Sequence, residues 1–120
     1  MASEELLSSI TAYHHYVYDK LETILSACTN PLQRKKVQDL AFDVSRLLLK
    51  THKVVITGQE GLVQPVTTKA QSAKVLLEEK MSRNEDIDSI ITTMQSSSDD
   101  LWKITLQLPG DPVAKPPEED

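Results

Sequence analysis

Apolar residues recur along most of this chain at steps of three and four, the spacing that places them on one side of an α-helix. The most regular stretch runs from Ser82 to Leu108 and contains neither Gly nor Pro. Its apolar line alternates steps of four and three through Ile87, Ile91, Met94, Ser98, Leu101, Thr105 and Leu108. This a/d pattern is typical of a helix packed lengthwise on other helices, so the other segments are expected to provide the surface on which it lies.

The first segment, residues 3–28, has an apolar arc wider than one seam. Its main stripe consists of Leu6, Ile10, Tyr13, Val17, Leu21, Ile24 and Cys28, and a flanking stripe consists of Leu7, His14, Tyr18 and Leu25. A wide arc predicts a helix in contact with two neighbours, as in a bundle, rather than one strand of a two-stranded coiled coil.

A second helix is predicted over residues 31–56, after a clear boundary at Thr29-Asn30-Pro31. Asn30 is a favourable N-cap, Pro31 suits the first helical position, and Gln33 occupies the capping-box position. The core face of this helix is expected to comprise Val37, Leu40, Ala41, Val44, Leu47, Leu48 and Val55. Its last turn is rich in β-branched residues, so an extended segment is the alternative there.

The second helix also has an apolar line outside its core face. Phe42, Leu49 and Ile56 follow one another at seven-residue spacing. One short bundle does not need this second line for its core. It is therefore a candidate surface for a partner helix or for a second copy of the chain.

Residues 59–65, with Gly61 and Pro65, are predicted to form a loop, and a third helix is predicted over residues 68–81. The apolar face of this helix is expected to comprise Ala70, Ala73, Leu76, Leu77 and Met81. Ser82 and Glu85 have capping-box spacing and favour a fourth helix over residues 84–108. The alternative is one continuous rod from residue 68 to 108, about 60 Å long at ~1.5 Å per residue.

Together these elements predict an all-α domain over residues 1–108, folded as an antiparallel, up-down bundle of three or four helices. Residues 109–120 contain four prolines and four acidic residues without apolar periodicity, so a disordered acidic tail is expected there. The chain has a net charge of −5, of which this tail contributes −3. The near-neutral remainder is a poor match for a nucleic-acid backbone, and Arg34-Lys35-Lys36 is expected to be a solvated helix face.

Composition points to an intracellular, cytoplasmic protein, with the nucleus left open. The single Cys28 cannot form an intramolecular disulfide, and the first residues, MASEELL, have no basic or apolar leader pattern. The longest apolar runs have three residues, far below the roughly 20 needed to span a bilayer, so no membrane insertion is expected.

The sequence carries none of the phosphate-binding, zinc-protease or nucleophile-elbow motifs, so neither an enzyme nor a bound cofactor is expected. The most unusual segment is residues 13–18, YHHYVY. His14 or His15 could form a metal or catalytic site with Asp19, but no other helix offers a second pair of ligands. The alternative places His15 and Tyr16 on a partner-binding surface.

Two features of the last predicted helix stay open at this point. Trp102 either closes one end of the core or, if exposed, is a candidate hot spot for a partner. Ser96, Ser97 and Ser98 mark a close helix crossing, a kink or a phosphorylation site.

The function expected from these patterns is non-enzymatic protein–protein interaction, as a small helical subunit or adaptor of a cytoskeletal, trafficking or chromosome-associated assembly. The candidate partner-binding residues are Phe42, Leu49, Ile56, Tyr16, His15 and Trp102. One alternative is a coiled-coil homodimer that acts as a structural spacer. A second alternative is a metal-binding or catalytic helical protein centred on His14 and His15.

Overall fold

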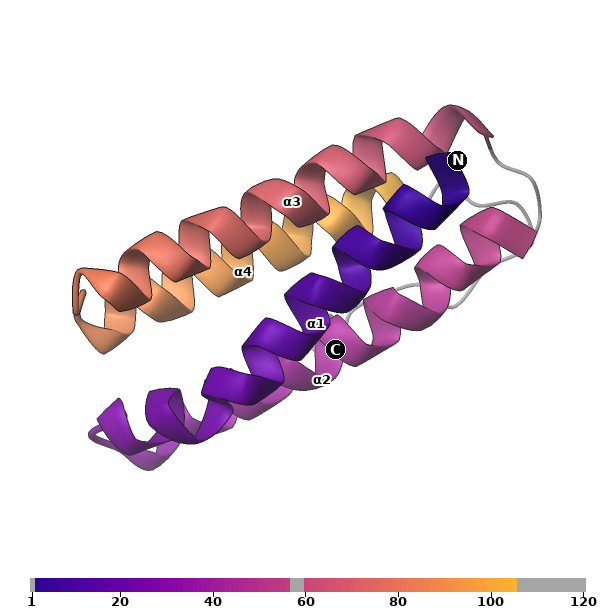
Figure 1. The fold of residues 1–120 in the computed structure, drawn as a ribbon. Helices are drawn as coiled ribbons and strands as arrows, with labels where there is room; N and C mark the ends of the chain where they lie inside the picture. The colour runs from indigo at the N-terminus through magenta and orange to yellow at the C-terminus, as the bar shows by residue number, and fades with distance from the viewer. Residues whose placement is uncertain (1, 57–59, 106–120) are drawn as a thin grey trace.

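The computed structural model describes residues 2–56 and 60–105, and this part of the chain forms four helices. They are α1 (Ala2–Ala27), α2 (Pro31–Ile56), α3 (Glu60–Ser82) and α4 (Ile87–Thr105), and they pack against one another as a bundle (Figure 1). The predicted all-α bundle is therefore confirmed, with the four-helix alternative realised. The segment predicted to be a disordered tail, residues 109–120, lies outside the described residues.

Each helix runs antiparallel to the next one along the chain, which gives two hairpins, α1–α2 and α3–α4 (Figure 1). The Tyr18 hydroxyl donates a hydrogen bond of 2.9 Å to the carbonyl oxygen of Ala41 across the first hairpin. Lys69 forms an ion pair of 3.1 Å with Asp100 across the second. The short connections between these helices are the physical reason for the antiparallel pairing.

The two hairpins stack so that α1 lies beside α3 and α2 lies beside α4, each pair running in the same direction (Figure 1). Gln71 of α3 donates a hydrogen bond of 3.2 Å to Ser9 of α1. Gln33 of α2 donates one of 3.0 Å to Asp88 of α4. This arrangement gives every helix two flanking neighbours, as the wide apolar arc of α1 predicts.

The core is built mainly from aliphatic side chains. In α1 the buried residues include Leu6, Ile10, Tyr13, Val17 and Ile24, and in α2 they include Val37, Leu40, Ala41, Val44 and Leu47. Leu21, Cys28, Leu48 and Val55 are partly buried against this cluster. The main stripes predicted for these two helices are thus confirmed.

The start of α2 has the expected cap. The backbone N–H of Gln33 donates a hydrogen bond of 2.8 Å to Oδ1 of Asn30, which satisfies one of the free N–H groups at the helix start. Oε1 of Gln33 accepts hydrogen bonds from the backbone N–H and the hydroxyl of Thr29, at 2.7 and 3.0 Å. In a capping box, the Gln33 side chain would bond to the N–H of the N-cap residue, Asn30. It bonds instead to Thr29, the residue before the N-cap.

A break separates α3 from α4, so the single rod considered as an alternative does not form. Asn84 adopts a left-handed conformation with φ of 54°. The N–H of Glu85 bonds to the carbonyl of Lys80 at 3.1 Å, and that of Asn84 bonds to the carbonyl of Met81 at 3.2 Å. These two bonds form a Schellman motif, which ends a helix by reversing the chain direction. The spacer hypothesis loses the long helix on which it depended.

The predicted start of the fourth helix at residue 84 is wrong by three residues. Asp86 is the N-cap, and its Oδ1 accepts a hydrogen bond of 2.9 Å from the N–H of Ser89. Ser82, which the capping-box pattern selects, is the last residue of α3, and its hydroxyl bonds to the carbonyl of Glu79 at 3.1 Å. The Schellman motif uses the residues between Ser82 and Asp86, so the new helix cannot begin before it.

The loop predicted over residues 59–65 is also wrong, because α3 begins at Glu60 and includes Pro65. Proline removes one helical hydrogen bond, which destabilises a helix interior by ~3 kcal/mol. Val63 and Val66 are buried, at 9% and 0% exposure. Their burial stabilises the fold by about 1.5–3 kcal/mol each, which is enough to offset the proline.

Candidate partner-binding surface

The outward side of α2 carries large apolar side chains that the bundle leaves uncovered. Phe42, Leu49 and Ile56 are 58%, 69% and 82% exposed. Residues at seven-residue spacing lie almost one above the other on a helix, so these three form a line about 21 Å long at ~1.5 Å per residue. We call the side of α2 that carries Phe42, Leu49 and Ile56, together with the polar side chains beside them, the α2 face. The prediction that a second apolar line exists beside the core face of this helix is confirmed.

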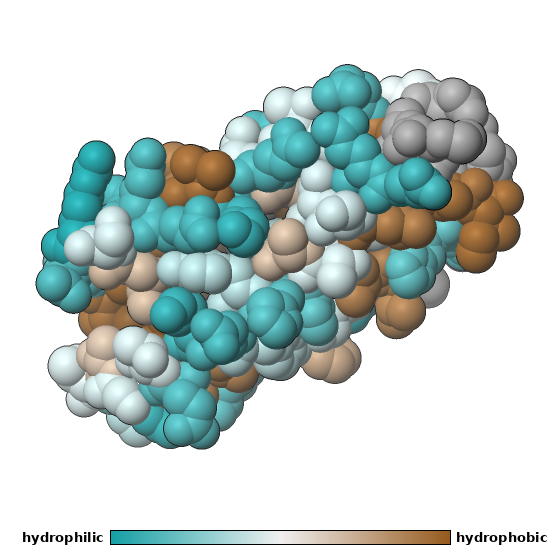
Figure 2. All heavy atoms as spheres, viewed as in Figure 1, coloured by the Kyte–Doolittle hydropathy of each residue, from teal (hydrophilic) through white to brown (hydrophobic). Residues whose placement is uncertain are grey.

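The α2 face is exposed because the other sides of α2 pack against the rest of the bundle. Leu40, Val44 and Leu47 turn to the core and are at most 2% exposed. Contacts with α1 and α4 occupy the two flanks of α2. The side opposite the core is therefore the one that no other described helix covers. Figure 2 shows hydrophobic side chains gathered over the C-terminal half of α2, at the lower right of that view.

The charged residues on this half of α2 are mostly basic. From Phe42 to Ile56 they are Asp43, Arg46, Lys50 and Lys53, with His52 as a further titratable residue. Asp43 is only 2% exposed, and its carboxylate lies 4.0 Å from the guanidinium of Arg46. His52 and Lys53 are exposed. The charged residues from Phe42 to Ile56 thus sum to +2, although the whole chain is acidic.

Two cations lie along the flank of α2 that meets α4. The guanidinium of Arg46 is 5.9 Å from the ring centroid of Phe42 and 5.3 Å from that of Trp102. The Nζ of Lys50 is also 5.3 Å from the Trp102 centroid. Burial lowers the pKa of Lys50, and the positive charges of Lys53 and Arg46 lower it further. These cation–π contacts hold positive charge at the edge of the apolar line.

Trp102 does not meet the condition for a partner hot spot, because its side chain is only 3% exposed. It belongs to the core cluster that joins α4 to the other helices. The other open interpretation, that this ring closes part of the core, is the one the structure supports. The physical reason is that Arg46 and Lys50 of α2 extend over the ring and shield it from solvent.

Tyr16 and His15 lie on a different part of the molecule from the α2 face. Tyr16 is half-buried beside α3, where the Nζ of Lys74 is 5.6 Å from its ring centroid. Burial raises the pKa of Tyr16, as do the nearby carboxylates of Glu78 and Asp19, while Lys74 opposes them. His15 is exposed on α1. The predicted site residues therefore do not come together as one surface.

His14 takes part in a polar cluster between α1 and α2. Its Nε2 lies 3.1 Å from Oγ of Ser45, and its ring centroid is 4.7 Å from that of Tyr18. The Tyr18 hydroxyl is 2.9 Å from the same Ser45 oxygen. Since Tyr18 donates its proton to the Ala41 carbonyl, Ser45 donates to Tyr18 and accepts from the N–H at Nε2 of His14.

The metal site considered at His14 and His15 has no matching set of ligands in the part of the chain that the structure describes. In residues 2–56 and 60–105, no group of three His, Cys, Asp or Glu side chains is arranged to hold a metal ion. His14 instead uses its ring in the hydrogen-bonded cluster with Ser45. Burial lowers the pKa of His14, and His15 lowers it further.

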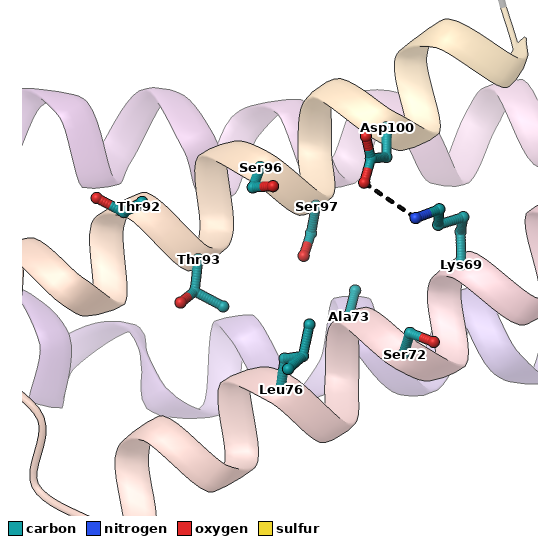
Figure 3. A pocket seen from close by; sticks show the side chains of 9 residues that line it. All are labelled: Lys69, Ser72, Ala73, Leu76, Thr92, Thr93, Ser96, Ser97 and Asp100. Atoms are coloured by element: carbon teal, nitrogen blue, oxygen red, sulfur yellow. Dashed lines mark hydrogen bonds and ion pairs between the residues drawn. The ribbon is translucent and has the colours of Figure 1, made fainter.

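A shallow hollow of about 260 Å³ lies between α3 and α4 (Figure 3). Most of the side chains that line it are Ser or Thr. The lining consists of Lys69, Ser72, Ala73, Leu76, Thr92, Thr93, Ser96, Ser97 and Asp100. The Lys69–Asp100 ion pair closes one end of it (Figure 3). Ser97 also hydrogen-bonds the buried Tyr13, whose pKa is raised by burial. The small side chains of Ser96 and Ser97 thus line an open space between α3 and α4, and the three interpretations of the serine run stay predictions.

The sequence patterns did not identify further exposed apolar residues, which include Leu32 of α2, 79% exposed, and Val75 and Leu76 of α3. The apolar pattern predicts that Leu76 lies on the core face of the third helix, but it is 45% exposed, and its neighbour Val75 is 51% exposed. Leu77 occupies the core position, with 0% exposure. In a run of three apolar residues on a helix only one can face the core directly, since successive side chains point about 100° apart. This 100° spacing is the sequence signal that could have shown that two residues of the run Val75-Leu76-Leu77 are exposed.

None of the helices in residues 2–56 and 60–105 has the length and hydrophobicity that a bilayer crossing requires. Comparison of the chain with models of protein families, with curated proteins and with solved structures finds no match.

Proposed function

We propose that this chain is a non-enzymatic protein–protein interaction module, a small helical subunit or adaptor of a larger intracellular assembly in the cytoplasm. Its partner docks on the α2 face. The observation that supports this proposal is the line of Phe42, Leu49 and Ile56, all at least 58% exposed on a helix whose opposite side forms the core.

The physical argument concerns the free energy of hydration. Full burial of a Leu, Ile or Phe side chain stabilises a folded or bound state by about 1.5–3 kcal/mol. Single exposed apolar residues are common on protein surfaces, but three large ones on one side of the same helix are typical of interaction sites. Helix-in-groove and helix-on-helix recognition use anchors at this spacing.

The test is affinity capture from cell extract with quantitative mass spectrometry, comparing the wild-type chain with Phe42→Lys/Leu49→Lys. The matched control is Val75→Lys/Leu76→Lys, which changes two exposed apolar residues of α3 by the same charge. We expect the α2 variant to lose specific partners that the α3 variant retains, with helical circular dichroism unchanged in both.

Retention of all partners by the α2 variant would contradict the proposal. Loss of helicity in that variant alone would place Phe42 and Leu49 in the core and would contradict it as well.

A further inference from the structure

We propose further that Ser96 is a phosphorylation site for an acid-directed protein kinase and that its phosphate pairs with Lys36 of α2. Three serines in a row, residues 96–98, precede Asp99 and Asp100 on α4. Kinases of this class select a serine by the carboxylates that follow it within a few residues. The sequence pattern fits more than one of the three serines, and their exposure in the folded chain distinguishes them.

The fold leaves one of the three serine side chains fully open to solvent. Ser98 is 1% exposed, and Ser97 is half-buried and hydrogen-bonds the buried Tyr13. Ser96 is exposed, with Asp99 three residues after it. Ser96 therefore combines an accessible hydroxyl with the acidic residue that the kinase class requires.

Ser96 lies at the edge of two hollows that both contain lysines. It lines the hollow between α3 and α4 together with Lys69 (Figure 3). It also lines a second hollow of about 440 Å³ between α2 and α4, which we call the α2–α4 hollow, together with Lys36 and Lys103. A phosphate on Ser96 would thus enter a space bordered by lysines of three helices.

The two lysines of the α2–α4 hollow are available to pair with this phosphate. Lys36 and Lys103 are exposed, and neither forms an ion pair or a side-chain hydrogen bond within residues 2–56 and 60–105. The carboxylates that line the same hollow already have donors, since Asp99 accepts a hydrogen bond of 2.9 Å within α4 and Asp100 pairs with Lys69 at 3.1 Å. A phosphate brings three strong acceptor oxygens. A bond from Lys36 to one of them would join α2 to α4.

The chemical step is a phosphoryl transfer from ATP. Oγ of Ser96 attacks the γ-phosphorus, the bond from that phosphorus to the β–γ bridging oxygen breaks, and ADP leaves. The hydroxyl proton passes to the catalytic base of the kinase. A kinase binds its substrate as an extended segment, so transfer takes place while α4 is locally open, a motion that folded proteins undergo. The phosphate meets Lys36 when the helix closes again.

The first experiment incubates the full chain with ATP and casein kinase 2, an acid-directed kinase, and maps the product by tandem mass spectrometry. We expect one phosphate per chain, on Ser96, and none in Ser96→Ala. Asp99→Asn should lower the initial rate at least tenfold, because it removes the carboxylate three residues after Ser96. The matched control Asp88→Asn, at an exposed position near the start of α4, should leave the rate within twofold.

Two outcomes of this experiment would overturn the inference. One is the absence of phosphate on the folded chain when casein is modified in a parallel reaction. The other is phosphate on Ser97 or Ser98 in place of Ser96.

The second experiment titrates the phosphate on Ser96 by phosphorus NMR. The second pKa of a phosphoserine is ~6, and a nearby ammonium group lowers it, whereas nearby carboxylates raise it. We expect this pKa to be higher by at least ~0.3 in phosphorylated Lys36→Gln than in the phosphorylated wild type, because the variant loses the ammonium group.

The matched control is Lys35→Gln, and it should leave the pKa of the phosphate unchanged. Lys35 is the neighbour of Lys36, but it pairs with Asp39 at 2.9 Å and is not part of the α2–α4 hollow. The same pKa in Lys36→Gln as in the wild type, or equal shifts in the two lysine variants, would overturn the pairing with Lys36.

Discussion

The guanidinium of Arg46 lies 5.3 Å from the ring centroid of Trp102, so a residue of the surface helix α2 covers the one Trp of the core. The same guanidinium is 5.9 Å from the Phe42 ring on the outside of α2. Arg46 therefore lies between a buried ring and an exposed ring. The contact couples the packing of α4 to the charge at the edge of the α2 face.

Removal of the Trp102 ring should destabilise the bundle strongly. Truncation of a buried aromatic residue to Ala costs about 3–5 kcal/mol, because it removes apolar burial and leaves a cavity. We expect Trp102→Ala to reduce the free energy of unfolding by this amount and Trp102→Phe to reduce it by less, about 1–3 kcal/mol. Urea unfolding followed by circular dichroism measures both. A loss below 1 kcal/mol for Trp102→Ala would show that the ring is not a core residue.

The turn between α3 and α4 makes a prediction about Asn84. At φ of 54° a residue with a Cβ is strained, and Gly is not. Asn84→Gly should therefore raise the free energy of unfolding by about 0.5 kcal/mol, and Asn84→Ala should lower it by ~1 kcal/mol. Thermal unfolding of the two variants beside the wild type is the measurement. Stabilisation by both, or by Ala alone, would mean that the left-handed conformation is not adopted in solution.

The hydrophobic pattern predicts the helices well where one face carries all the large apolar residues. The stripe from Leu6 to Ile24 is such a case, and its residues fill the core as expected. The outward line of Phe42, Leu49 and Ile56 was also visible, because seven-residue spacing keeps it apart from the core face. The candidate surface could be located for the same reason.

The pattern fails where tertiary contacts override local signals. Gly61 and Pro65 indicate a loop, but the burial of Val63 and Val66 against the other helices keeps this segment helical. No rule of spacing could show which helices would cover those two valines. The exposure of Trp102 was undecided for the same reason, since it depends on the distant residues Arg46 and Lys50.

Ser98 occupies a core position of α4 and gives a third prediction. Its side chain is 1% exposed, and its Oγ has no hydrogen-bond partner among the described residues. An unsatisfied buried hydroxyl destabilises a fold by about 1–3 kcal/mol. Ser98→Ala should thus raise the free energy of unfolding, by about 1 kcal/mol more than the helix-propensity gain of Ser96→Ala at an exposed position. If the two variants gain equally, the Ser98 hydroxyl is satisfied in solution.

The cluster of His14, Ser45 and Tyr18 makes the stability of the bundle depend on pH. Burial lowers the pKa of His14 in the folded state, with a further contribution from His15. The unfolded chain therefore binds a proton at His14 at a higher pH than the folded chain does, near the ordinary pKa of ~6.5. Stability from this residue is complete above that value and is lost as the pH falls from it to the folded pKa.

The measurement is the free energy of unfolding in urea at several pH values between 8 and 5.5. We expect the wild type to lose stability toward the acidic end, because unfolding there takes up a proton at His14. His14→Gln should reduce this loss, since Gln does not titrate and can still donate a hydrogen bond to Ser45. His52→Gln, at an exposed position of α2, is the matched control for replacing one His by Gln. A flat wild-type profile, or equal slopes for the wild type and His14→Gln, would show that His14 does not couple folding to protonation.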